Sequence, residues 1–233
     1  MRVSIPTPDG GEMGAHVSLP PAGAGPGVLV LMEIYGVGSY IKRATERLAA
    51  LGYVALAPDL YRRIEPGLEI EHDEAGLQRA LRTAQRLDPT GAEEDSVTAL
   101  GALRELPQVE GRPVGVLGFC LGGTLAFGVA AAAEPAAAVC YYGSGIPEML
   151  GRAAQITCPV LLHFGGQDPY IPREAAERVC EAAAARAGWE CHIQPDAGHA
   201  FDNHDAPMFS RPEAAARAWS LTRAFLAQNL PVG

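Results

Sequence analysis

The chain has 233 residues, of which 48% are hydrophobic and 19% are charged. This composition is typical of a globular protein and too apolar for a disordered one. Asp and Glu outnumber Lys and Arg by 27 to 18, which gives a formal net charge of −9 and argues against binding to a nucleic-acid backbone.

Strand-like and helical patterns alternate along the chain. An edge hairpin is predicted around residues 13–19, followed by a Pro- and Gly-rich connection into a core strand at 27–32. Further strands are predicted at 53–57, 114–117, 137–142, 160–164 and 190–194, and helices at 41–51, 73–87, 92–106, 124–131, 173–187 and 212–229. Such alternation predicts an α/β fold with a mostly parallel central sheet and helices on both faces. We expect a single domain spanning residues 1–233.

Targeting and cysteine patterns indicate a soluble cytoplasmic protein. The first residues do not combine a basic start with an apolar run, and no segment of about 18 or more residues is continuously apolar, so neither a secretory signal nor a membrane contact is expected. No C-x-x-C pair is present, and the cysteines are scattered, so a disulfide framework or a zinc site is not expected. The five cysteines are Cys120, Cys140, Cys158, Cys180 and Cys191.

A glycine-rich motif directly after the predicted strand at 114–117 places Cys120 in a special position. Residues 118–122 read Gly-Phe-Cys-Leu-Gly, which is G-x-S-x-G with cysteine in place of serine. In that motif a strand turns sharply into a helix and exposes the nucleophile, and the flanking glycines permit the close packing. The helix N-terminus favours a thiolate over a thiol. A buried cysteine between packing glycines is the alternative interpretation.

Two later segments supply an acid and a base in the order typical of α/β-hydrolases. Asp168 follows the strand at 160–164, and His199 follows the strand at 190–194. Each alone could be an ordinary loop residue, but a thiol nucleophile needs a base and a group that orients the base. His204 competes for the role of base. Its neighbours Asp202 and Asp205 lack the spacing of a metal motif, so no metal is expected. His16 and His72 are expected to face solvent.

The chain resembles the dienelactone hydrolase family, whose elbow contains cysteine. The resemblance implies an α/β-hydrolase fold with Cys120 as nucleophile, His199 as base and Asp168 as the orienting acid. It also implies that Glu33 lies against the cysteine, holds the resting thiol and gives way when substrate binds. The matching stretches cover nearly the whole chain: Gly118–Gly123, Met32–Val37, Ala57–Tyr61, Tyr141–Gly143, Gly165–Asp168 and Ala197–Phe201.

The loop after the first core strand is also expected to contribute to catalysis. In this architecture one oxyanion-hole amide comes from that loop and the other from the residue after the nucleophile. The two amides would belong to Ile34 and Leu121. A carboxylate at the end of a buried strand, as at Glu33, needs a partner or a raised pKa unless it faces water.

Departures from the family pattern bear on the substrate. Lactone-cleaving members have an arginine a few residues after the catalytic histidine, but residues 200–204 here contain none. Arg79 is the nearest possible replacement for a second arginine that comes from the segment before the elbow. Since a guanidinium recognises a carboxylate best, we expect a preference for neutral or aryl esters, with Tyr35 and Phe201 contributing to the pocket.

The sequence therefore predicts a cysteine hydrolase that cleaves carboxylic esters or lactones through a thioester. Activity on phosphoryl esters is the alternative within the same fold, since an oxyanion hole and a strong nucleophile also suit that electrophile. A thiol redox sensor would need a nearby resolving cysteine, and a silent binding scaffold would have no need of the triad. No second glycine-rich loop fits a nucleotide, so no cofactor is expected. The expected partner is a small-molecule substrate, and monomer and dimer both stay open.

Overall fold

The computed structural model describes residues 1–233 and contains one sheet of eight strands. Strand β1 is antiparallel to β2, and β2 is antiparallel to β4. The six strands β3 to β8 run parallel to one another. This mostly parallel sheet confirms the predicted fold class. In spatial order the strands are β1 (Arg2–Pro6), β2 (Glu12–Ser18), β4 (Val54–Pro58), β3 (Gly27–Leu31), β5 (Val114–Phe119), β6 (Ala138–Tyr141), β7 (Val160–Gly165) and β8 (Trp189–Gln194).

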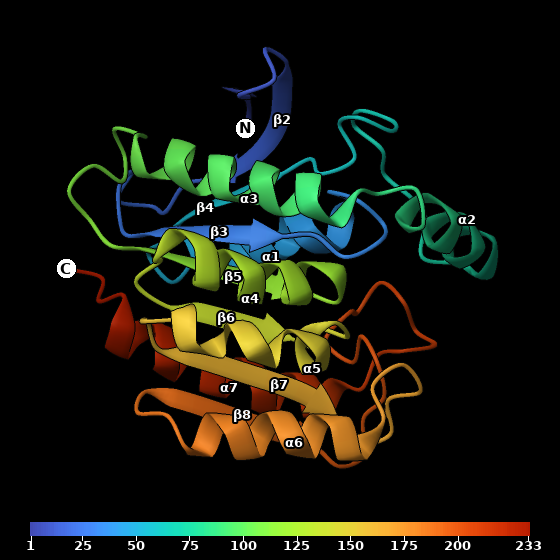
Figure 1. Cartoon of the computed structure of the whole chain (residues 1–233). Coiled ribbons are helices and arrows are strands. Elements are labelled where there is room, and N and C mark those ends of the chain that lie inside the picture. Colours follow the sequence, from blue (N-terminus) through green and yellow to red (C-terminus); the bar gives the residue numbers. More distant parts are fainter.

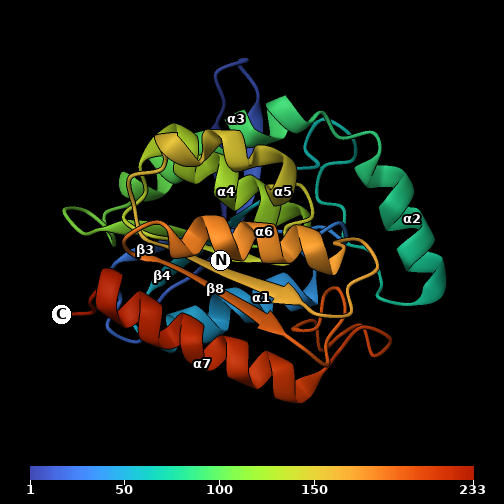
Figure 2. The same cartoon turned by 60° about the horizontal axis from the view of Figure 1, so that its bottom comes forward.

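Helices cover both faces of the sheet (Figures 1 and 2). On one face lie α1 (Ser39–Ala49) and α7 (Pro212–Asn229), and α7 has the predicted bounds. The other face carries α3 (Pro89–Arg104), α4 (Leu121–Ala133), α5 (Ile146–Met149) and α6 (Arg173–Ala184). Helix α2 (Glu74–Ala84) lies apart from both layers, beyond the C-terminal ends of the strands (Figure 1). Helix α5 and the 3₁₀ helix Leu150–Gln155 were not predicted.

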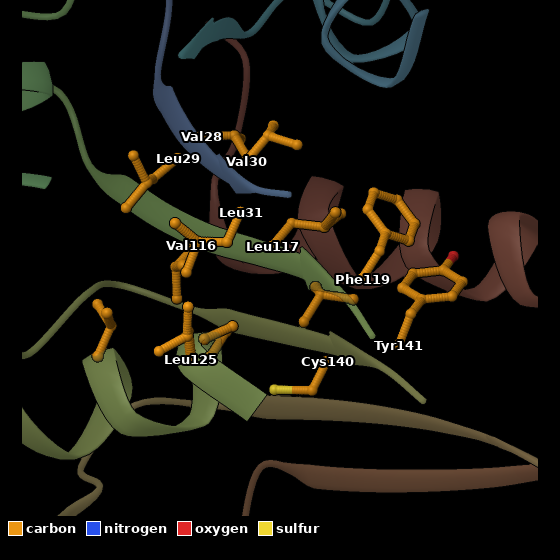
Figure 3. Packing of buried hydrophobic residues seen from close by; sticks show 14 of the residues in the cluster. Val28, Leu29, Val30, Leu31, Val116, Leu117, Phe119, Leu125, Cys140 and Tyr141 are labelled. Carbon is orange, nitrogen blue, oxygen red and sulfur yellow. The ribbon is translucent and has the colours of Figure 1, made fainter. Parts of the chain in front are cut away.

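The core forms around the central parallel strands. Every residue of β3, β4, β5, β6 and β7 is buried, because helices cover a parallel sheet on both faces and its strands are therefore continuously apolar. Figure 3 shows side chains of β3 and β5, such as Leu29 and Val116, packed among those of α4 and β6. Each buried Val or Leu contributes about 1.5–3 kcal/mol relative to exposure. These strands form a rigid frame for the loops at their C-terminal ends.

Two expectations about local structure need correction. The edge hairpin pairs β1 with β2, so its first strand begins well before residue 13. Cys180 of α6 and Cys191 of β8 form a disulfide, with their Cα atoms 5.1 Å apart, so the expectation that the cysteines form no disulfides is wrong for this pair. The chain reverses between α6 and β8 and brings the two cysteines together, a register that their sequence spacing does not reveal. The remaining three cysteines are free.

No helix of the structure combines the length and apolarity that crossing a membrane requires.

Candidate active site

Cys120 occupies the sharp turn between β5 and α4. Its φ and ψ are +54° and −113°, a conformation that residues other than glycine rarely adopt and that is typical of functional sites. The backbone holds it there: the Cys120 amide donates to the Tyr141 carbonyl at 3.0 Å, and its carbonyl accepts from the Thr124 amide at 3.1 Å. The side chain is half-buried at the C-terminal end of the sheet.

The two glycines of the motif permit this turn by close packing. A Cβ atom on Gly118 would collide with the carbonyl of Gly122, and one on Gly122 would collide with the carbonyl oxygens of Leu31 and Met32. Helix α4 can therefore begin directly against the end of β3 only if both positions lack a side chain. The structure thus has the strand-to-helix elbow that the motif predicts.

His199 and Asp168 lie in line with the Cys120 sulfur. The His199 Nε2 atom is 3.0 Å from Cys120 Sγ, and Nδ1 is 2.7 Å from Asp168 Oδ2. The other carboxylate oxygen, Oδ1, accepts from the amides of Tyr170 at 2.8 Å and Ile171 at 3.2 Å. The carboxylate is therefore fixed by its own loop while it orients the imidazole. Loops after β5, β7 and β8 bring the three predicted residues together.

The charges of this group favour a cationic imidazole. Burial lowers the pKa of His199, but the Cys120 thiolate and the Asp168 carboxylate outweigh burial and raise the pKa to about 10. The sulfur also lies at the N-terminus of α4, where the peptide dipoles favour negative charge. The arrangement therefore holds a cationic imidazole directly beside the sulfur.

His204 lies apart from this group. Its side chain is exposed, whereas Asp202 is fully buried and accepts from Arg47 at 3.2 Å. Asp205 pairs with Arg43. The three residues of this segment thus face different surroundings, and His204 has no contact with Cys120.

Glu33 is buried but differs from expectation in its partners. One carboxylate oxygen, Oε1, accepts from Asn203 Nδ2 at 2.7 Å and from His72 Nε2 at 3.0 Å. Glu33 makes no hydrogen bond to Cys120, whose sulfur faces His199 instead. The expectation that Glu33 holds the resting thiol is therefore not met in this structure. Asn203 and His72 both bind Oε1 and orient the carboxylate.

His72 is a residue whose environment the sequence reasoning misjudged. It was expected to face solvent, but its side chain is only 7% exposed and lies against Glu33. Its ring also stacks on Tyr35, with 4.2 Å between ring centroids. Asn203 was missed as well, although the absent arginine drew attention to its segment. No sequence pattern marked His72, because its place at the site depends on the path of the long segment between β4 and α3.

The predicted oxyanion amides face the same region as the sulfur. Ile34 and Leu121 both line the cavity that contains Cys120 and His199, and neither amide donates to another backbone group or side chain. The Ile34 carbonyl accepts from the Tyr61 hydroxyl at 2.8 Å. Because Tyr61 is fully buried, this hydrogen bond restricts the orientation of the loop after β3.

The cavity has a volume of about 370 Å³ and a largely apolar wall. Helix α2 contributes two leucines four residues apart, which lie on the same face of the helix. No lysine or arginine lines the cavity, and Glu33 is its one carboxylate. The apolar side chains that line it beyond the loop after β3 and the elbow are Leu77, Leu81, Pro89, Ala200 and Phe209.

The structure separates the three predicted substrate-binding residues. Tyr35 lines the cavity. Phe201 does not, because its fully buried ring packs beneath the site against Tyr142, with 5.2 Å between centroids. Arg79 also lies outside the cavity and pairs with Glu65 at 2.8 Å on the exposed side of α2. The structure therefore brings only Tyr35 of these three residues to the cavity, and the leucines of α2 were missed.

A mostly parallel sheet with a nucleophile elbow, and with histidine and aspartate on later loops, defines the class of α/β-hydrolases. Comparison with known proteins assigns the chain within this class. The model of the dienelactone hydrolase family matches residues 13–230, and the chain belongs to this family.

Individual relatives agree with this assignment. The chain is 37% identical to a carboxymethylenebutenolidase of Pseudomonas sp., over 99% of this chain and 96% of the relative. Among solved structures, it is similar to a putative dienelactone hydrolase from Klebsiella pneumoniae, with a TM-score of 0.83, 29% identity and 98% coverage of both chains. It is also similar to a dienelactone hydrolase-like promiscuous phosphotriesterase from metagenomic libraries, with a TM-score of 0.82, 26% identity and coverage of 100% and 99%. The protein is thus a hydrolase of carboxylic esters or lactones.

Proposed function

We propose that this enzyme hydrolyses neutral carboxylic esters, including aryl esters, through an acyl-thioester on Cys120. The observation that carries the substrate preference is the charge of the cavity. No lysine or arginine lines it, whereas the carboxylate of Glu33 does. The one cationic group of the cavity is the His199 imidazolium, which is already paired with Asp168. A substrate carboxylate would therefore lose its hydration without gaining a lysine or arginine partner.

The distances at the site support a mechanism in two stages. In the first stage the Cys120 thiolate attacks the ester carbonyl, and the amides of Ile34 and Leu121 stabilise the resulting oxyanion. The intermediate collapses with cleavage of the carbon–oxygen bond, and His199 Nε2 gives its proton to the departing alkoxide. Asp168 holds the imidazole in the required orientation.

In the second stage water attacks the thioester. Neutral His199 takes a proton from this water, and the Cys120 thiolate leaves as the carbon–sulfur bond breaks. The products are an alcohol and a carboxylic acid, and the thiolate and imidazolium pair is restored. The proton given to the alkoxide and the proton taken from water are both carried by His199 Nε2, which lies 3.0 Å from the sulfur.

The experiment compares the wild type with Cys120→Ala and Cys158→Ala on a neutral aryl acetate. Cys158 is a free cysteine outside the cavity and serves as the control. Cys120→Ala should abolish turnover and Cys158→Ala should retain it, and mass spectrometry of the quenched wild type should show the acyl group on Cys120. Near-full activity of Cys120→Ala would refute the mechanism.

The substrate preference is tested with two esters that differ only in a carboxylate on the acyl part. The neutral ester should have the higher kcat/KM, and its kinetics should change little between low and high salt, because screening acts on charge pairs. A wild-type preference for the anionic ester would refute the proposed selectivity.

Phosphoryl esters are a second candidate substrate. The structural similarity to a promiscuous phosphotriesterase favours this possibility, since the same nucleophile and oxyanion donors could serve a phosphorus centre. Aryl phosphotriesters should then give a steady release of the aryl alcohol. A single burst that ends with phosphorylated Cys120 would show that the site reacts with these compounds without turning them over.

A further inference from the structure

The Tyr35 hydroxyl stands out among the polar groups near the cavity. Tyr35 is 3% exposed, and no protein group accepts a hydrogen bond from its buried hydroxyl. A buried hydroxyl without a partner costs about 1–3 kcal/mol, and phenylalanine would fill the same space without this cost. Tyr35 thus lines the site and has a hydrogen-bond donor that no protein group uses.

The surroundings of Tyr35 fix its ring beside the reacting groups. Its ring stacks on that of His72, and its carbonyl accepts from the Ile70 amide at 3.0 Å. It follows Ile34 directly in sequence and lines the same cavity as Cys120. A buried ring that stacks on a neighbour, on a backbone fixed by a hydrogen bond, loses little further freedom when substrate binds, which suits a preorganised donor.

The hydroxyl stays protonated in this environment. Burial raises the pKa of Tyr35, and the charges of Glu33 and Cys120 raise it further, followed by those of Tyr170 and Asp73. The hydroxyl is a neutral donor at any pH at which the enzyme would work.

We propose that the Tyr35 hydroxyl donates a hydrogen bond to the oxyanion of the tetrahedral intermediate, as a third donor beside the amides of Ile34 and Leu121. This inference rests on the proposed function, because the oxyanion forms only when Cys120 attacks an ester carbonyl. The donor gains a partner as charge develops on the carbonyl oxygen, so it stabilises the intermediate more than the bound ester. The unpaired hydroxyl thus lowers the folding stability of the free enzyme, and its hydrogen bond to the oxyanion lowers the activation barrier of the reaction.

The test compares Tyr35→Phe with wild type in turnover and in the binding of an aryl trifluoromethyl ketone. Such a ketone adds to the thiolate and carries an oxyanion but no leaving group. Tyr53→Phe is the control, because Tyr53 is also buried but lies outside the cavity. The adduct on Cys120 is identified by mass spectrometry and its affinity is measured by fluorine NMR.

Tyr35→Phe should lower kcat and the affinity for the ketone about 10–100-fold each, the range expected for loss of one donor to a charged oxygen. KM for the ester should change little. The melting temperature should rise by about 2–4 °C for each kcal/mol regained, because the variant no longer buries an unpaired hydroxyl. Tyr53→Phe should leave kcat and the ketone affinity unchanged.

Equal kcat and equal ketone affinity in Tyr35→Phe and wild type would overturn this inference while leaving the proposed function intact. A lower kcat with unchanged ketone affinity would also overturn it, since the hydroxyl would then act on the leaving group. So would a fall in melting temperature, which would reveal a structural partner. Absence of any ketone adduct on wild-type Cys120 would instead refute the proposed function, and this inference with it.

Discussion

Replacement of His199 by alanine tests the proposed proton carrier most directly, with His204→Ala as its control. The pKa of His199 rises from the ordinary 6.5 to about 10, which corresponds to a preference for the imidazolium on the order of 5 kcal/mol. Loss of a general acid and base costs about 10²–10⁴-fold in rate, or about 3–5 kcal/mol of transition-state stabilisation. His204 is exposed and does not line the cavity, so His204→Ala should lose less than about twofold.

The assay measures kcat/KM for a neutral aryl ester from pH 6 to 10.5, together with the thiolate absorbance near 240 nm. Because the pKa of His199 is raised, the imidazolium is present below pH 10 and is lost as the pH rises through about 10. Wild-type activity should therefore fall above about pH 10, where the departing alkoxide finds no proton. In His199→Ala the thiolate signal at neutral pH should weaken, since the sulfur loses its cationic neighbour.

Three results would contradict this reasoning. A larger loss of activity in His204→Ala than in His199→Ala would show that His199 is not the base. An unchanged thiolate signal in His199→Ala would show that the N-terminus of α4 alone ionises the sulfur. A wild-type activity that falls already below pH 8 would mean that Cys120 and Asp168 do not raise the pKa of His199 as the geometry indicates.

Two further predictions concern the frame of the site. Tyr61→Phe removes the hydrogen bond to the Ile34 carbonyl, 2.8 Å long, and should lower kcat about 2–10-fold with little change in KM; an unchanged kcat would show that the loop is held by other contacts. Reduction of the disulfide between Cys180 and Cys191, which are 11 residues apart, should lower the free energy of unfolding by about 2–3 kcal/mol. Urea unfolding of the wild type and of the double variant Cys180→Ser/Cys191→Ser, with and without reductant, measures this loss, and equal midpoints would contradict it.

Much of the fold could be predicted because buried parallel strands have a simple sequence pattern, a short continuous run of apolar residues. The strands around residues 29, 116 and 161 are short runs of Val and Leu, buried on both faces. Helix α7 is long and amphipathic enough for its limits to be read from the pattern. Helix α5 has four residues, too few to show a period, and its formation depends on contacts with α4 and α6 rather than on local sequence.

The candidate site divides in the same way between local and distant signals. Cys120, Asp168 and His199 each follow a strand, and the ends of parallel strands meet at one edge of the sheet. His72 and Leu77 lie in the excursion between β4 and α3, whose position over the site depends on tertiary contacts. Among these are the isolated bridge between residues 36 and 69 and the hydrogen bond from the Ile70 amide. No local sequence pattern predicts such tertiary contacts.

The neutral side chain at position 203 links the charge of the cavity to the state of Glu33. The Asn203 amide binds one carboxylate oxygen of Glu33 but supplies no positive charge, so no arginine or lysine balances this carboxylate of the cavity. Together with His72 it also holds Glu33 away from the sulfur, which leaves His199 as the hydrogen-bonding partner of Cys120. The proposed preference for neutral substrates and the pairing of Cys120 with His199 therefore have a common structural origin. A change at position 203 should alter both properties together, whereas a change on the exposed side of α2 should alter neither.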